Sequence, residues 1–220
     1  MQIKTQNLFD LEKRIANHFL SEFVIRWQAL GGINDYIITL GKTLPKDRYE
    51  EAIENIWIAK SAKISPTAFI GSPCIIDENA QIRHCAFIRG SAIVGKNSVV
   101  GNSTELKNCI LFDSVQVPHF NYIGDSILGY MAHLGAGAVT SNVKSDKSLV
   151  TINLDGEKIQ TGLKKFGALV GDFTEVGCNA VLCPGTILGK NVTVYPTSCV
   201  RGYIPSNTIF KNNAETVFKI

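Results

Sequence analysis

The sequence predicts a mainly β protein whose chain winds into a parallel β-helix. An aliphatic or aromatic residue recurs at every sixth position from Ile58 to Phe112, and the fourth residue after most of them is small. Glycine often follows the aliphatic residue directly. A period of six is typical of a triangular coil in which each side is one short extended segment plus a corner. We expect the aliphatic side chain to point inward and the glycine to relax the backbone beside it.

The six-residue ladder changes along the chain. Two five-residue steps follow Phe112, and the ladder stops near Val139 and resumes at Val170. Residues 140–168 are therefore predicted to form a long inserted loop. A loop of this length is rarely a simple connector, and insertions in repeat proteins commonly lie on the functional face. We expect this one to contribute to function, with a surface decoration as the alternative.

Residues 1–56 are predicted to form a helical cap. Apolar residues recur at spacings of three and four from Leu8 to Leu30, a short second helix follows over 35–41, and a third apolar stretch passes Tyr49, Ile53 and Ile56. Because the open ends of repeat proteins need covers, we expect these helices to cover the first coil. The β-helix itself is expected over residues 57–210, followed by a tail over 211–220.

Composition and charge argue against several partners. The formal net charge is +3 with no basic stripe, so we expect no nucleic-acid ligand. No apolar stretch reaches the roughly 18 residues of a membrane span, and the first residues lack a signal-peptide core, so a cytoplasmic protein is expected. The six cysteines contain no CxxC pair and are expected to be free and mostly buried.

Polar side chains concentrate before the inserted loop. His119 follows Pro118 at a disturbed step of the ladder, and we expect the disturbance to turn its side chain away from the core. Among the four histidines it has the best context for acid–base chemistry, because imidazole titrates near neutral pH. From these residues alone, a structural His119 is an equally good interpretation.

Four segments resemble a known family in their order and spacing: FIRGSA, GNSTELKN, PHFNYIGD and LGAGAVTSN. They are similar to the acetyltransferase domain of the bifunctional N-acetylglucosamine-1-phosphate uridyltransferase/glucosamine-1-phosphate acetyltransferase family and of related archaeal sugar-1-phosphate enzymes. The resemblance implies that the coil winds left-handed, against the usual crossover preference. It also implies a homotrimer with sites between subunits. The implied activity is direct N-acetyl transfer from acetyl-CoA to an amino-sugar-1-phosphate, without a metal. No segment resembles the uridyltransferase domain, so we expect that step to be absent.

The resemblance assigns roles to single residues around the acceptor. His119 matches the base that takes a proton from the sugar amine. Arg89 and Lys107 match groups that hold the phosphate, for which a guanidinium fork and an ammonium are suited. Tyr122 would hydrogen-bond the phosphate or the sugar. The family's sugar-contacting Asn is replaced by His133, which leaves the identity or pose of the acceptor open.

Further matches concern acetyl-CoA. Ala136 would line its path, with backbone amides polarising the thioester carbonyl. Asn142 matches a position near the coenzyme, and Lys147 stands for the basic residue of the family's shorter loop. Arg201 and Lys211 are two candidates for the basic residue that meets the coenzyme phosphate.

Three alternatives remain open. One is a non-catalytic protein that binds a sugar nucleotide or serves as an oligomerisation scaffold, and another is an acetyltransferase with a different amine acceptor. The third is a γ-type carbonic anhydrase, whose zinc is held by three histidines. His84 and His119 have the long spacing of such a site, but position 124 is Gly and His133 lies too far along the chain.

Overall fold

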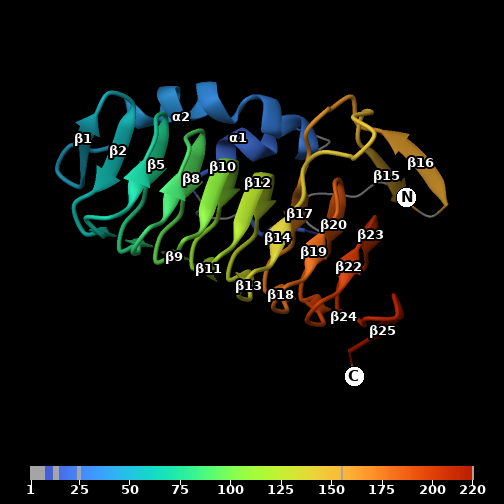
Figure 1. Cartoon of the computed structure of the whole chain (residues 1–220). Helices are drawn as coiled ribbons and strands as arrows, with labels where there is room; N and C mark the ends of the chain where they lie inside the picture. Colours follow the sequence, from blue (N-terminus) through green and yellow to red (C-terminus); the bar gives the residue numbers. More distant parts are fainter. Residues whose placement is uncertain (1–7, 12–14, 24–25, 155, 220) are drawn as a thin grey trace.

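The computed structural model describes residues 8–11, 15–23, 26–154 and 156–219. The chain forms a parallel β-helix of about nine turns, so the predicted fold class is confirmed (Figure 1). Each full turn has three faces, which we number in the order in which the chain first reaches them.

The strands of the three faces stack in parallel register. Face 1 comprises β2 (Ile56–Ala59), β5 (Cys74–Ile76), β8 (Ala92–Val94), the carboxyl-terminal halves of β10 (Glu105–Leu111) and β12 (Tyr122–Leu128), β17 (Ala168–Val170), β20 (Thr186–Leu188) and β23 (Tyr203–Ile204). Face 2 comprises β3 (Lys63–Ile64), β6 (Gln81–Ile82), β9 (Val99–Asn102), β11 (Gln116–His119), β13 (His133–Leu134), β18 (Glu175–Val176), β21 (Thr193–Val194) and β24 (Thr208–Phe210). Face 3 comprises β4 (Phe69–Ile70), β7 (Phe87–Ile88), the amino-terminal halves of β10 and β12, β14 (Val139–Thr140), β19 (Val181–Leu182) and β22 (Cys199–Val200).

The aliphatic ladder fills the interior as predicted, but the first of its two shortened steps lies elsewhere. Leu111, not Phe112, is in register with Val94 and Leu128 and is fully buried. Phe112 instead packs outside the coil on Phe9, with ring centroids 5.3 Å apart. The five-residue steps therefore fall within β10 and β12, where the chain turns from face 3 to face 1. The expectation that a shortened step coincides with His119 is wrong.

The glycines that follow aliphatic residues allow close stacking. A Cβ at Gly101 would lie 1.6 Å from the carbonyl oxygen of Pro118 in the next turn, and one at Gly95 would lie 2.6 Å from the carbonyl carbon of Phe112. Neither glycine has a positive φ. The positive φ values belong to corner residues such as Asn79, at 58°. The prediction that these glycines relax the backbone is therefore wrong, because they are needed where two turns touch.

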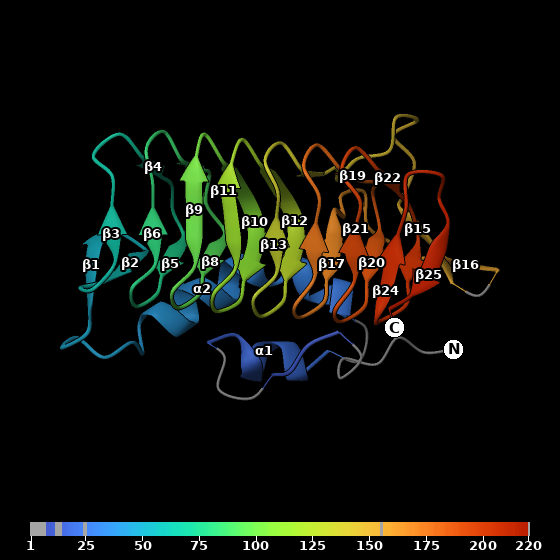
Figure 2. The same cartoon turned by 90° about the horizontal axis from the view of Figure 1, so that it is seen from below.

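The N-terminal segment lies along the side of the β-helix (Figures 1 and 2). It contains α1 (Asn17–Ser21), the 3₁₀ helix η2 (Arg26–Gly31) and α2 (Ile33–Gly41). α2 contacts β5, β8 and β10, all on face 1. The expectation that these helices cover the first coil is wrong, because the outward side chains of face 1 are themselves apolar and need a partner.

Both ends of the β-helix carry antiparallel strands instead. The stretch through Tyr49 and Ile53, predicted to be helical, is β1 (Tyr49–Ile53), which pairs with β2. The predicted tail over 211–220 contains β25 (Thr216–Phe218), which folds back on β24. These strands hydrogen-bond to the edges of the first and last turns, and such edges would otherwise be exposed. The proposed domain boundaries at 56 and 210 stay predictions.

The inserted loop leaves the coil between β14 and β17, close to its predicted bounds. It contains an antiparallel hairpin of β15 (Thr151–Leu154) and β16 (Glu157–Gln160). Val150, Ile152 and Phe166 are fully buried in the main core. The loop is thus anchored to the coil by apolar packing. None of the described helices is long and apolar enough to cross a membrane.

Candidate active site

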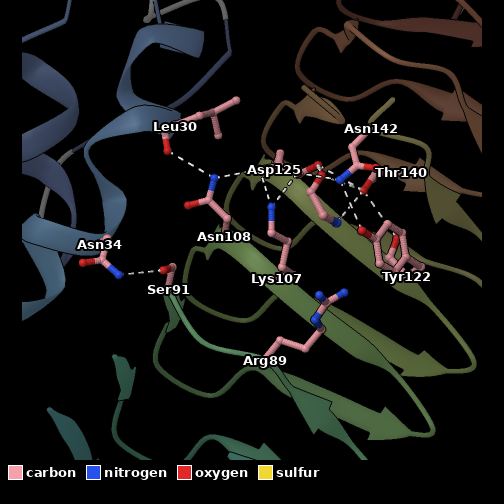
Figure 3. A network of polar contacts seen from close by, with 12 residues as sticks. Leu30, Asn34, Arg89, Ser91, Lys107, Asn108, Tyr122, Asp125, Thr140 and Asn142 are labelled. Carbon is pink, nitrogen blue, oxygen red and sulfur yellow. Dashed lines mark hydrogen bonds and ion pairs between the residues drawn. The ribbon is translucent and has the colours of Figure 1, made fainter. Parts of the chain in front are cut away.

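The two shortened steps bring a set of polar side chains together where face 3 meets face 1. In β10 the step exposes Lys107 and Asn108, and in β12 it places Asp125 one turn further along (Figure 3). Asn108 and Asp125 have positive φ values of 49° and 48°. Asn and Asp tolerate this left-handed conformation better than other residues with a Cβ, which explains their presence at a tight corner.

Asp125 is the centre of this network. Its side chain is 5% exposed, and its carboxylate accepts from the Lys107 ammonium at 3.0 and 3.2 Å and from the Asn108 amide at 2.8 Å. The Asn142 amide donates to its other oxygen. A buried carboxylate with several donors fixes the orientation of each of them. Asp125 therefore positions two residues for which the sequence predicts a binding role, Lys107 and Asn142.

The two predicted phosphate ligands are on neighbouring turns of face 3. Arg89 follows β7, and its Nη1 contacts Glu105 at 2.9 Å. The side chains of Arg89 and Lys107 are 48% and 25% exposed. Together with Glu105 and Asp125 they form a cluster of zero formal charge. An anion would therefore be recognised by the remaining N–H donors of these side chains rather than by a strong net field.

Tyr122 and Asn142 join this cluster from the following turns of face 3. A Cβ at Gly124 would lie 2.5 Å from the Tyr122 hydroxyl oxygen, so the Tyr122 side chain lies flat across that glycine. The Asn142 amide donates to the hydroxyl at 3.2 Å. Burial raises the pKa of Tyr122, against the opposing effect of this hydrogen bond. The hydroxyl thus keeps its proton at neutral pH and can donate to a ligand.

His119 lies at the other corner of face 3, where the chain arrives from face 2. Its side chain is exposed, and none of the described residues hydrogen-bonds to the imidazole. The Gly137 N–H donates to the His119 carbonyl at 3.0 Å, so Ala136 and Gly137 lie directly against His119. The structure brings His119 and Ala136 together, but the Gly137 amide is already occupied and is not available to polarise a thioester.

Asn121 holds this corner. It is 2% exposed, accepts from the His119 N–H at 3.1 Å, and donates to the carbonyls of Gly135 and Ala138 at 2.8 and 3.0 Å. One buried amide thereby links the backbone of His119 to the turn that contains Ala136. The position of His119 relative to Ala136 is fixed by this side chain.

His133 belongs to face 2. It lies in register with Gln116 and Glu175, and its Nδ1 is 2.7 Å from a Glu175 carboxylate oxygen. The sequence predicts that His133 contacts the acceptor. In the structure its side chain is already paired with Glu175, and it lies on a different face from Arg89 and Lys107.

The predicted coenzyme residues do not all come together in the structure. Asn142 belongs to the Asp125 network, whereas Arg201 lines a cavity at the carboxyl-terminal end of face 3. Lys147 is an exposed turn residue of the inserted loop. Lys211 pairs with Glu215 near the C-terminus, after the last strand of face 2. Of the two candidates for the coenzyme phosphate, only Arg201 lies in the cavity.

Asp125 and Asn121 were missed in the sequence analysis. Both stand within PHFNYIGD, the same segment as His119 and Tyr122. The signal for Asp125 was a polar residue at a five-residue step, where the corner is tightest. The signal for Asn121 was an amide at a slot that small residues fill in most other turns.

No three His, Cys, Asp or Glu side chains gather as metal ligands within the described ranges. His84 is bound to Thr67 through Nδ1 at 2.7 Å and His133 to Glu175, so the two are held apart from His119. The described residues therefore give the zinc alternative no support.

The six-residue coils place the chain in the class of hexapeptide-repeat β-helix proteins. Within that class, residues 71–154 match the model of the family described as GMPPB C-terminal domain. The bifunctional protein GlmU of Methanococcus vannielii is 31% identical over 152 residues, which are 69% of this chain and 34% of that protein. The bifunctional sugar-1-phosphate nucleotidylyltransferase/acetyltransferase of Sulfurisphaera tokodaii is 26% identical over 208 residues, 94% of this chain and 47% of that protein. These relatives confirm the resemblance predicted from the sequence, and the chain spans half of their length or less.

Among solved structures, the chain is similar to a mutant of AntD, an N-acyltransferase from Bacillus cereus in complex with dTDP and coenzyme A. The TM-score is 0.37 at 15% identity, over 77% of this chain and 89% of that chain. A likeness of this size gives no information on the roles of individual residues.

Proposed function

We propose that the protein transfers an acetyl group from acetyl-CoA to the amine of an amino-sugar-1-phosphate. The observation that carries the proposal is the arrangement around face 3. His119 stands at one corner beside Ala136, and Lys107, Tyr122 and the Asp125 network occupy the other side of the same face. The name of the relative from Sulfurisphaera tokodaii, which pairs a sugar-1-phosphate with an acetyltransferase, supports the same reaction.

In this mechanism the acceptor lies along face 3. Arg89 and Lys107 donate to its phosphate, and the Tyr122 hydroxyl donates to the phosphate or to the sugar. The His119 imidazole then removes a proton from the amine as the nitrogen attacks the thioester carbonyl of acetyl-CoA. The coenzyme thiol leaves, so neither a covalent enzyme intermediate nor a metal takes part. The coenzyme would run past Ala136 towards Arg201.

We further propose that the active protein is a homotrimer in the cytoplasm. Face 1 is covered by the N-terminal segment of its own chain, so contacts between subunits would use faces 2 and 3. The open surface of face 3 then faces a neighbouring subunit, which would complete the acceptor site. Light scattering coupled to size exclusion gives the mass of the assembly, and a monomer that turns over would contradict this part of the proposal.

The reaction is tested with purified protein, acetyl-CoA and a panel of acceptors, by following release of the coenzyme thiol. The panel contains glucosamine-1-phosphate, galactosamine-1-phosphate and glucosamine. His119→Ala should lower kcat by roughly 10²- to 10⁴-fold with a phosphorylated acceptor. His84→Ala is the control, because His84 is also exposed and its imidazole is hydrogen-bonded to Thr67.

Equal rates for wild type and His119→Ala would overturn the role of His119. Turnover of glucosamine but not of the sugar phosphates would overturn the roles of Arg89 and Lys107. Binding of the sugar phosphates without thiol release would favour the non-catalytic alternative instead.

A further inference from the structure

A cavity of about 490 Å³ opens on face 3 near the carboxyl-terminal end of the coil. It lies between the first part of the inserted loop and the strands β19 and β22. Its lining includes Lys144 and Asp146 from the loop, and Cys183, Cys199 and Arg201 from the coil. The cavity therefore combines two thiols with two cations.

The two thiols contact each other. The Sγ atoms of Cys183 and Cys199 are 3.4 Å apart, on neighbouring turns of the coil. Cys199 is exposed, whereas Cys183 is 5% exposed. Burial and the hydrogen bond to Cys199 raise the pKa of Cys183 to about 11. Cys183 thus keeps its proton at neutral pH, so its S–H is able to donate to the sulfur of Cys199, which is the accessible atom of the pair.

The charges around the pair favour an anion. Arg201 and Lys144 contribute two positive charges and Asp146 one negative charge, which leaves a formal charge of +1 in the lining. The ammonium of Lys144 is 3.6 Å from Asp146 and 2.6 Å from the Ser148 hydroxyl, whereas Arg201 is exposed. A cationic cavity attracts anionic ligands and stabilises a thiolate within it.

We propose that Cys199 is a modification site for a small disulfide that carries carboxylates or phosphates, of the glutathione disulfide class. The thiolate of Cys199 attacks one sulfur of the disulfide, a protein–ligand S–S bond forms, and the ligand S–S bond breaks. Cys199 is oxidised, and the departing half of the disulfide is reduced and leaves as a thiolate that takes a proton from water. The S–H of Cys183 donates to the attacking sulfur, and Arg201 binds the anionic group of the ligand.

The bound half of the disulfide occupies the cavity and prevents any other ligand from using it. A thiol in excess reverses the reaction, so the occupancy of the cavity follows the ratio of disulfide to thiol around the protein. This modification does not depend on the proposed acetyl transfer.

The chain contains its own controls. Cys85 and Cys178 are also exposed, but neither lines the cavity, and within the described ranges neither has a second sulfur within hydrogen-bond distance. Exposure alone therefore predicts equal reaction at Cys85, Cys178 and Cys199. The proposal predicts that Cys199 reacts first.

The test treats the reduced, full-length protein with oxidised glutathione near neutral pH and locates the adducts by peptide mass spectrometry over time. Cys199 should be modified roughly tenfold faster than Cys85 and Cys178. Dithiothreitol should remove the adduct. The neutral hydroxyethyl disulfide serves as a second probe, and Arg201→Gln should slow the reaction of Cys199 with glutathione disulfide but not with this neutral probe.

Reaction of Cys199 at the rate of Cys85 and Cys178 in the wild-type protein would overturn the proposal without any variant. Equal slowing of both probes by Arg201→Gln would overturn the role of charge. Cys183→Ser, with its fold checked by circular dichroism, should slow the reaction at Cys199 with both probes. An unchanged rate in that variant would overturn the role of the thiol pair.

Discussion

Face 1 and face 3 contain the same inward ladder but differ in the residue that precedes each ladder position. On face 1 this outer column is apolar and buried: Trp57, Ile75, Ile93, Ile110, Ile127, Leu169 and Ile187. On face 3 the corresponding column is mixed: Phe69, Phe87, Glu105, Tyr122, Val139, Val181 and Cys199. The chain covers the first column with its own N-terminal segment and leaves much of the second in contact with solvent.

The comparison shows that the residues that build the coil differ from the residues that determine the role of each face. The inward residues are equally buried on both faces and specify only that the chain coils. One outward column then decides whether a face becomes an internal interface or an open surface. Face 3 is the face on which the Asp125 network, the Phe69–Phe87 ring pair and the cavity are found.

The largest expected effect comes from placing a charge in the same column of each face. Ile93 is fully buried beneath the N-terminal segment, so Ile93→Asp would bury an unpaired carboxylate. We expect a loss of about 4 kcal/mol in the free energy of unfolding. Phe87→Asp changes the matching position of face 3, where the side chain is 42% exposed, and should cost less than about 1 kcal/mol. Urea denaturation of both variants measures the difference in unfolding free energy. Equal losses would mean that the outward columns of face 1 and face 3 do not differ in their contribution to stability.

The coil could be predicted because its inward period is strict and local. The covered face had a signal too, since an aliphatic residue directly precedes its ladder residue in successive turns, as in CII, AIV and CIL. The helical interpretation of the stretch from Tyr49 failed because its pairing with β2 is a tertiary interaction. Strand preference depends on such packing more than on the segment itself.

The sequence pointed to several residues of the candidate site but not to its layout or to its buried residues Asp125 and Asn121. The segments that resemble the family contain Arg89, Lys107, His119 and Tyr122. The hydrogen bonds around these residues depend on where the five-residue steps fall, which the resemblance does not give. The first of the two short steps was misplaced, because Phe112 looks like a ladder residue and instead packs on Phe9. That short corner lies at Lys107 and not at His119, whereas the second short step, which contains Asp125, lies where it was predicted.

A smaller effect tests whether the Asp125 network on face 3 stabilises the fold or is only a set of surface contacts. Asp125→Asn keeps a residue that tolerates positive φ but removes the charge that holds Lys107. Because Lys107 is 25% exposed, we expect a loss of about 2 kcal/mol, less than for a fully buried pair. It should also raise KM for the phosphorylated acceptor, since Lys107 loses its fixed position.

The matched control is Glu105→Gln, which breaks the more exposed contact with Arg89 on the same face. Its urea midpoint should stay at the wild-type value, because exposed ion pairs contribute little. If Asp125→Asn also leaves the midpoint unchanged, the Asp125 network does not stabilise the fold, and its role in positioning Lys107 is in doubt.

The smallest effect concerns Asn108, whose side chain joins the two faces. Asn108 donates to the Leu30 carbonyl at 3.2 Å and to Asp125 at 2.8 Å, so it connects the cover of face 1 with the network of face 3. Asn108→Gly removes both bonds without straining the positive φ, and we expect a loss of about 1 kcal/mol. Ser103→Gly is the control at a similar corner with a φ of 53°, where the hydroxyl bonds only to Asn102. Hydrogen exchange should then quicken in α2 for Asn108→Gly but not for Ser103→Gly, because the Asn108 side chain bonds to the N-terminal segment and the Ser103 hydroxyl bonds to Asn102. Unchanged exchange in α2 would mean that the remaining contacts, which include apolar packing on face 1 and the hydrogen bond from Asn34 to Ser91, hold the segment without Asn108, and that the two faces act independently.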